Sequence, residues 1–304
     1  MDNGFAIAIL GPTASGKSAV AERLAERLET SILSADAFQV YRGMDIGTNK
    51  PENRKACFGL DLVEPTQGYS LGVFLSHARA FIEQENAQDN DFVICGGTGL
   101  YARALLEGYY EIAPVHPDRE KIAEWVRQTE PEELIRQLEL ETEPPTKQTI
   151  QNVRHFSRWI ERKMSGALSK NGSNWKLRKL KFGLLLERSE LLSRIESRLD
   201  TMLRSGWLDE VRNLLERGIP TDCPGFKAIG YREIAMHLEG KLSLDETRQA
   251  ILVQTRQYAK RQMTWLRKEP DLIWLDANRH VKEIADEALK YLLMERGKQD
   301  GKVN

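Results

Sequence analysis

The sequence has no long apolar run, few cysteines and no overall excess of charge, and each absence excludes a class of protein. No apolar run approaches the roughly 18 residues that cross a bilayer, so we expect no membrane partner. The first residues carry neither the basic segment nor the cleavage site of an export signal. The three cysteines, Cys57, Cys95 and Cys223, form no Cys-x-x-Cys pair, which argues against a disulfide framework and a zinc site. We therefore expect a cytoplasmic protein.

Charge is balanced over the whole chain but not along it. The formal net charge is −1, so the composition alone indicates no polyanionic partner. Two segments nevertheless carry cations and no acids: Trp175 to Lys181 has four cations, and Gln254 to Lys268 has five. Such segments, with aromatic residues among the cations, suit a polyanion, although a solvated helix face would show the same pattern.

The most informative motif is the octapeptide Gly-Pro-Thr-Ala-Ser-Gly-Lys-Ser at residues 11–18. It fits the P-loop pattern G-x-x-x-x-G-K-[ST] and lies between an apolar run at 5–10, which predicts a strand, and a helical pattern at 19–25. The N–H groups of such a loop bind phosphate, Lys17 adds a point charge, and Ser18 can ligate Mg²⁺. The motif therefore predicts a phosphate chain bound by Gly11, Pro12, Thr13, Ala14, Ser15, Gly16, Lys17 and Ser18.

The remaining apolar runs predict an α/β fold. Further strands are expected at 31–36, 92–96, 182–187 and 272–276, with helical patterns between them. This alternation favours a P-loop NTPase-like parallel sheet flanked by helices. The segment 118–181 shows helical patterns and no clear strand, so we expect a mostly helical insertion there and a catalytic core made of 1–117 and 182–304.

The expected strands do not supply the acid that a nucleotide hydrolase needs. ATPases and GTPases pair the P-loop with a carboxylate at the end of a neighbouring strand, which holds Mg²⁺. Here the strand at 92–95 is followed by Gly96-Gly-Thr98, without a carboxylate. Asp36 ends another strand, but Ala-Phe-Gln-Val-Tyr follows it, which is unlike a metal site. A small-molecule kinase remains open, and the P-loop alone does not identify the reaction.

Six segments considered together suggest a family. They are the P-loop at 11–18, Ser-Ala-Asp-Ala-Phe-Gln-Val-Tyr at 34–41, Gly-Met-Asp-Ile-Gly-Thr-Asn-Lys-Pro at 43–51, Gly-Gly-Thr-Gly-Leu-Tyr at 96–101, Ile-Gly-Tyr at 229–231 and Thr-Arg-Gln-Tyr-Ala-Lys-Arg-Gln-Met-Thr-Trp-Leu-Arg at 255–267. In these segments the chain resembles the tRNA dimethylallyltransferases, which prenylate N6 of the adenosine beside the anticodon. The second alternative is an adenylate isopentenyltransferase, which uses a free nucleotide.

The resemblance implies a reaction in which diphosphate leaves and an amine attacks. The P-loop would hold dimethylallyl diphosphate, with Mg²⁺ held by Thr13 or Ser18. A carboxylate within reach of the amine could take its proton, and by the resemblance this general base is Asp36. Thr98 and Arg119 match the pair that flanks the reaction channel in the family. We expect the protein to act as a monomer.

The resemblance also implies contacts with the tRNA anticodon stem-loop. Gln39 is expected to read the adenine edge, and Arg256, Lys260 and Arg261 could approach either the donor or the RNA. The chain departs from the family at Ala37, where a serine is usual. The expected RNA-contacting residues are Asp36, Ala37, Phe38, Gln39, Thr98, Arg119, Arg154, His155, Phe156, Ser157, Arg158, Lys227, Gly230, Tyr231 and Arg232.

Overall fold

The structure is a computed structural model that describes residues 4–86, 90–107, 118–138, 144–164 and 177–300. The chain divides into two compact units. The first combines Met1–Glu107 with Lys176–Asn304, and the second is Gly108–Trp175. In the described residues, no helix is both long and apolar enough to cross a membrane.

The first unit is built on a six-stranded parallel sheet, which confirms the predicted fold class. The strand order is β3-β2-β4-β1-β5-β6, so β1 lies between β4 and β5, with Ile9 opposite Cys95 on one side and Phe182 on the other. Every residue of β1 is buried. The strands are β1 Phe5–Leu10, β2 Ile32–Ser34, β3 Cys57–Phe58, β4 Phe92–Gly96, β5 Arg178–Leu185 and β6 Leu272–Asp276.

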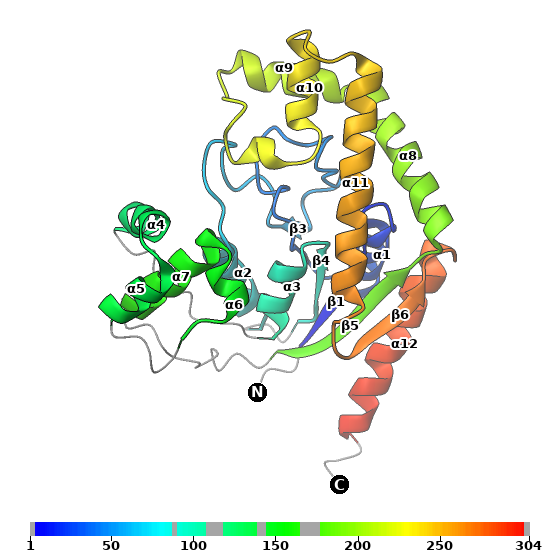
Figure 1. The fold of residues 1–304 in the computed structure, drawn as a ribbon. Coiled ribbons are helices and arrows are strands. Elements are labelled where there is room, and N and C mark those ends of the chain that lie inside the picture. Colours follow the sequence, from blue (N-terminus) through cyan, green and yellow to red (C-terminus); the bar gives the residue numbers. More distant parts are fainter. Residues whose placement is uncertain (1–3, 87–89, 108–117, 139–143, 165–176, 301–304) are drawn as a thin grey trace. The chain divides into compact units, whose positions relative to one another are not determined.

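Helices of the first unit pack on the sheet and continue beyond it. Helices α1 and α12 contact each other, whereas α8 contacts α11, and α10 contacts both α9 and α11. Figure 1 shows α8 to α11 gathered beyond one end of the strands, with α11 running back to the sheet. The helices are α1 Lys17–Leu28, α2 Leu71–Asn86, α3 Gly99–Leu106, α8 Arg188–Arg204, α9 Trp207–Glu216, α10 Tyr231–Leu238, α11 Leu244–Leu266 and α12 Val281–Asp300.

The second unit is helical in its described residues. Its helices are α4 Arg119–Gln128, α5 Pro131–Gln137, α6 Lys147–Ile150 and α7 Val153–Met164. Ile122, Val126, Leu134, Phe156 and Ile160 are among the residues of its core.

Strand β5 begins at Arg178 and pairs with β1 from there. Its position corrects the predicted boundary of the insertion and the predicted role of the basic run at 175–181. The predicted insertion boundary at 181 therefore falls inside a core strand. The alternation of cations and leucines concealed this strand. Lys181 is buried and forms ion pairs of 3.0 Å with both Glu107 and Glu269, and Lys179 pairs with Glu107 at 2.7 Å. Lys181 neutralises the buried Glu269, and both lysines pair with Glu107, so they do not form the RNA-facing surface that the basic run suggested.

Candidate active site

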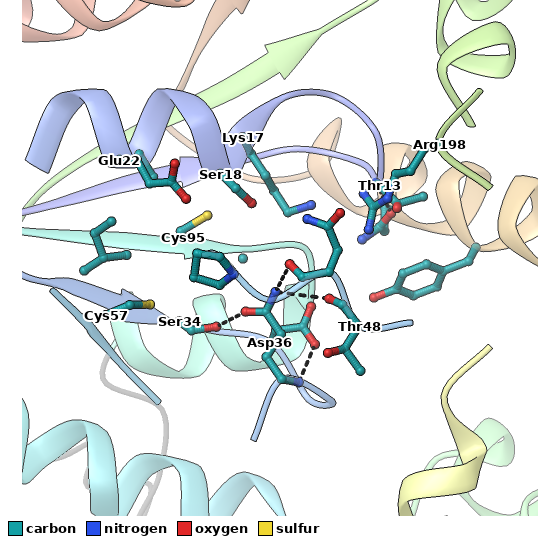
Figure 2. Close-up of a pocket in the computed structure, with 18 residues that line it drawn as sticks. Thr13, Lys17, Ser18, Glu22, Ser34, Asp36, Thr48, Cys57, Cys95 and Arg198 are labelled. Atoms are coloured by element: carbon teal, nitrogen blue, oxygen red, sulfur yellow. Dashed lines mark hydrogen bonds between the residues drawn. The ribbon is translucent and has the colours of Figure 1, made fainter. Parts of the chain in front are cut away.

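The P-loop joins the end of β1 to the start of α1, as the motif predicts. Gly16 precedes the helix with φ of 87°, a left-handed conformation that glycine adopts without strain. A Cβ on Gly11 would lie 2.5 Å from Ser15 Oγ, so a side chain there would displace the Ser15 hydroxyl. Figure 2 shows Lys17 leaving α1 and reaching into a cavity beside Thr13 and Arg198. Local backbone geometry therefore directs this lysine toward a ligand.

Two cations on this side of the cavity have no acidic partner in the part of the chain that the structure describes. Burial lowers the pKa of Lys17, and the nearby charge of Arg198 acts in the same direction. Burial also lowers the pKa of Arg198, against the opposing charge of Asp36. Neither side chain forms an ion pair with any residue that the structure describes. Such poorly solvated cations gain from an anionic ligand.

Arg198 was missed by the sequence analysis, although its position gives a signal. It comes from α8, on which Leu191, Ile195 and Leu199 are buried. Arg198 is three residues after Ile195, so it lies at the edge of that buried stripe. An arginine beside a buried stripe is a candidate for a partly buried site.

Asp36 both shapes a turn and keeps a free oxygen. Its Oδ1 accepts hydrogen bonds from the N–H groups of Phe38 (2.8 Å) and Gln39 (3.3 Å), as an aspartate at a turn does. Its Oδ2 has no partner among the residues described. Because the turn fixes the carboxylate while leaving one oxygen available, Asp36 can hold the turn and still accept a proton. Ala37 lies within this turn, half-buried.

The Gln39 side chain is held by three neighbours. Its Nε2 donates to the carbonyl oxygens of Thr48 (3.2 Å) and Asn49 (3.0 Å). Its Oε1 accepts from Ser34 Oγ at 2.8 Å. Both N–H bonds are thus satisfied within the protein, and only the remaining acceptor capacity of Oε1 is available to a ligand.

Gln262 connects the P-loop to Gly97, the residue before Thr98, and no role was predicted from the sequence for Gln262 or Tyr258. Oε1 of Gln262 accepts from the Thr13 N–H at 2.8 Å, while its Nε2 donates to the Gly97 carbonyl at 2.9 Å. Burial raises the pKa of Tyr258 to about 12, and hydrogen bonding to Thr98 acts against that rise. Tyr258 and Gln262 are four residues apart on α11 and share one face. That spacing within the 255–267 motif was the available signal.

Two cavities meet at Asp36. The smaller, about 70 Å³, is lined by Lys17, Ser18 and Gln39 among others. The larger, about 280 Å³, has apolar walls and includes Phe38. Both cavities are lined by Thr13, Asp36, Thr48, Arg198 and Tyr258. The larger cavity is also lined by Ile195, Leu199, Met202, Lys227, Ile229, Ile251 and Arg261.

The oxygen groups near the P-loop fit a magnesium ion that a bound phosphate chain would share. Thr13 and Ser18 both line the smaller cavity, and Glu22 lies on the same wall. Among the described residues no group of three acids, histidines or cysteines could hold a metal by itself. Mg²⁺ commonly keeps several waters and binds through substrate phosphates with few protein ligands. The set is therefore suited to Mg²⁺ that arrives with a diphosphate.

The segment 227–232 contributes less exposed surface than expected. Lys227 lines the larger cavity, and Arg232 is exposed. Tyr231, in contrast, is fully buried and donates to Glu210 at 2.6 Å. Its side chain cannot contact RNA in this structure, so that expectation is wrong. Gly230 precedes α10 with φ of 100°, and a Cβ there would lie 2.2 Å from Trp207.

In the second unit, α7 divides the predicted RNA contacts between surface and core. Arg154 and His155 are exposed. Phe156 and Ser157 are buried, so they pack inside the unit and do not offer an RNA surface. Arg158 bonds Glu161 at 2.7 Å.

Arg119 and the cations of α11 occupy different environments. Arg119 begins α4 and lies 3.4 Å from Glu161, both in the second unit, so its role with Thr98 stays a prediction. On α11, Arg256 pairs with Glu196, and Lys260 is exposed. Arg261 lies over the Tyr258 ring, 5.7 Å from its centroid.

Comparison with known proteins places these features in context. The model of the family "IPP transferase" matches residues 39–269, and that of "Isopentenyl transferase" matches residues 5–57. A tRNA dimethylallyltransferase of Thermomicrobium roseum is 39% identical over 285 residues, covering 89% of this chain and 85% of that protein. A tRNA dimethylallyltransferase 2 of Geotalea uraniireducens is 38% identical over 300 residues, covering 94% of this chain and 96% of that protein.

A solved structure is similar over nearly the whole chain. It is the tRNA isopentenylpyrophosphate transferase of Bacillus halodurans, with a TM-score of 0.73 and 29% identity. The match covers 98% of this chain and 99% of that one. The likeness therefore extends over both units.

Proposed function

This chain belongs to the IPP transferase family, and we infer from that membership that it is a tRNA dimethylallyltransferase. It transfers a dimethylallyl group from dimethylallyl diphosphate to N6 of the adenosine next to the anticodon, and it releases diphosphate. One observation carries the assignment of the site: Asp36, whose Oδ2 has no partner among the described residues, lines the same cavity as Lys17 and Arg198, which form no ion pair with those residues. A proton acceptor and an anion site thus lie together.

The P-loop side stabilises the leaving group. As the bond between the allyl carbon and oxygen breaks, negative charge develops on the diphosphate. Loop N–H groups, Lys17 and Arg198 are already in place for that charge, which makes them effective in a site with little water. Mg²⁺ bound with the diphosphate, next to Thr13 and Ser18, would add Lewis-acid stabilisation of the same charge.

The Asp36 side handles the acceptor amine. An exocyclic amine is a weak nucleophile because its lone pair is delocalised into the ring. Oδ2 of Asp36 takes a proton from the amine during attack, and Oε1 of Gln39 accepts the other N–H. Gly97, the residue before Thr98, accepts a hydrogen bond from Gln262, which lines the same cavity as Asp36, and this supports Thr98 as a group at the edge of the reacting atoms.

The larger cavity is the side from which RNA approaches. An adenine inside a folded stem-loop must leave its stack to reach Asp36, at a cost of a few kcal/mol. Lys227 and Arg261 line this cavity and would contact RNA phosphates, which position the substrate without reading its sequence. The exposed Arg154 and His155 of α7 offer a second contact surface. We further propose that the protein acts as a monomer, because a single chain supplies both sides of the cavity. We also propose that it acts in the cytoplasm.

A transfer assay with alternative acceptors tests this function. The protein is incubated with Mg²⁺ and allyl-labelled dimethylallyl diphosphate, and either unmodified tRNA or AMP is the acceptor. We expect label in tRNA alone. Label in AMP alone would indicate an adenylate isopentenyltransferase. Label in neither acceptor, together with phosphate transfer from ATP, would indicate a kinase.

A further inference from the structure

A glutamate outside the cavity holds the loop that follows β2. Glu210, in the first turn of α9, accepts hydrogen bonds from three consecutive backbone N–H groups, those of Asp45 (2.7 Å), Ile46 (2.6 Å) and Gly47 (3.2 Å). The Tyr231 hydroxyl donates a fourth at 2.6 Å. Successive N–H groups in a turn form an anion-binding concavity. Here the anion that fills it is a carboxylate of the same chain, so the loop is fastened to α9.

The same loop orients the Gln39 amide. The acceptors of its two N–H bonds, the carbonyl oxygens of Thr48 and Asn49, directly follow the segment that Glu210 holds. Because a carbonyl oxygen can only accept, the NH₂ end of Gln39 has to face the loop. The amide oxygen then lies on the side of Ser34 and keeps one lone pair for a ligand.

We propose that Glu210 is a positioning residue that selects the acceptor through the 45–49 loop and Gln39. The inference rests on the proposed function, in which the acceptor is the amino group of adenine. With the loop fixed, Gln39 presents an oxygen, which suits the N–H of an aminopurine and opposes the oxygen of an oxopurine. Without the carboxylate, three N–H groups lose their acceptor and the loop relaxes. The Gln39 side-chain amide can then rotate so that its oxygen and NH₂ group exchange places.

Contacts other than those of Glu210 also hold this loop against α9 and should keep it attached when Glu210 is changed. A Cβ on Gly47 would lie 2.2 Å from Trp207 Nε1, so the loop rests directly on the helix. Its far end has a separate anchor. Buried Lys50 donates to the Tyr41 carbonyl and to the carboxylates of Asp45 and Asp61 at 2.6–2.7 Å. A Glu210 variant should therefore keep the loop attached while losing its exact placement.

The test compares two anticodon stem-loops that differ only in carrying adenosine or inosine beside the anticodon. Wild-type protein should bind the adenosine form more tightly, on the order of tenfold, because two facing oxygens would otherwise meet. In Glu210→Gln an NH₂ group replaces one acceptor oxygen. The ratio of affinities for the adenosine and inosine stem-loops should fall close to 1. The kcat/KM for tRNA should fall on the order of 10- to 100-fold. KM for dimethylallyl diphosphate should not change.

Two companion variants sharpen the result. Glu216→Gln changes an exposed glutamate of the same helix and should keep both the preference and kcat/KM. Gln39→Leu should abolish the preference by itself, and adding Glu210→Gln to it should lower the preference no further. If Glu210→Gln cannot be purified, Glu210→Asp retains the charge but shortens the reach, and it should narrow the preference in the same way.

The outcomes separate this inference from the function beneath it. A Glu210 variant that loses tRNA turnover or thermal stability but keeps the full adenosine preference would overturn the positioning role. A variant that keeps both preference and turnover would overturn it as well. Wild-type protein that transfers no prenyl group to tRNA would instead overturn the proposed function.

Discussion

The two sides of the cavity differ in whether their polar side chains have partners within the protein. On the P-loop side, Lys17 and Arg198 have no acidic partner in the described chain. On the other side, the Asp36 and Gln39 side chains are hydrogen-bonded within the protein, and among the described residues Asp36 Oδ2 and one lone pair of Gln39 Oε1 are left available. The first side is built to receive negative charge, and the second is built to accept N–H groups. This division matches a reaction between a diphosphate ester and an amine.

Removing the free oxygen of Asp36 should have the largest effect. Asp36→Asn preserves size and can still accept the turn hydrogen bonds, but it cannot take a proton at neutral pH. We expect kcat to fall by about 10²–10⁴ while tRNA binds with unchanged affinity. Single-turnover transfer and filter binding measure the two quantities. A fall in tRNA affinity equal to the fall in rate would show that Asp36 binds the acceptor and does not act as its base.

Removing the P-loop cation should impair binding and turnover of the diphosphate donor. Lys17→Ala deletes a charge that faces the leaving group, so we expect kcat/KM for the donor to fall by about 10²–10³. Affinity for tRNA without donor should stay the same. Titration calorimetry with inorganic diphosphate provides the donor-side measurement. Equal losses of diphosphate and tRNA affinity would contradict the division into two sides.

The lowered pKa of Lys17 predicts a pH dependence of smaller size. Lys17 is charged below its pKa, and burial brings that pKa below the ordinary lysine value. Diphosphate affinity should therefore begin to fall at a lower pH than an exposed lysine would give, by up to about tenfold. Lys17→Arg remains charged throughout this range. It should remove the pH dependence even if it weakens binding, and an identical profile in both proteins would exclude Lys17 as its source.

The smallest effect is expected for a single RNA phosphate contact. Arg261→Ala should weaken tRNA binding several-fold and reduce the slope of log affinity against log salt by about 1. Diphosphate binding should be unaffected. The matched control is Lys290→Ala, which removes one charge from an exposed position of α12. Equal salt slopes in both variants would show that Arg261 contacts no phosphate.

The sequence predicted the fold because its local patterns were strong. The run at 5–10, the P-loop and the following helix are contiguous, so spacing alone identified them. The two-residue β3 is too short for any periodicity, and the cations of Arg178 to Lys181 hid the start of β5. The buried Lys181 is acceptable inside the core only because Glu107 and Glu269 pair with it, although they lie about 70 to 90 residues away in sequence.

The same distinction explains what the sequence missed in the site. Asp36, Gln39 and the P-loop residues lie in short motifs with a recognisable chemistry, whereas Arg198 lies in no motif, and the motif that contains Tyr258 and Gln262 does not show that they reach the cavity from α11. Gln262 bonds Thr13 across 249 residues. A periodic pattern shows which face of a helix is buried, but it does not show which distant loop that face meets.

The most direct measurement follows both ends of the donor during one reaction. Dimethylallyl diphosphate is labelled with tritium in the allyl group and with radioactive phosphorus in the diphosphate, and it reacts with unmodified tRNA. If the P-loop holds a departing diphosphate, tritium enters the adenosine beside the anticodon and an equal amount of labelled diphosphate is released. Phosphorus label in the RNA would mean that the loop transfers phosphoryl groups, and it would contradict the account.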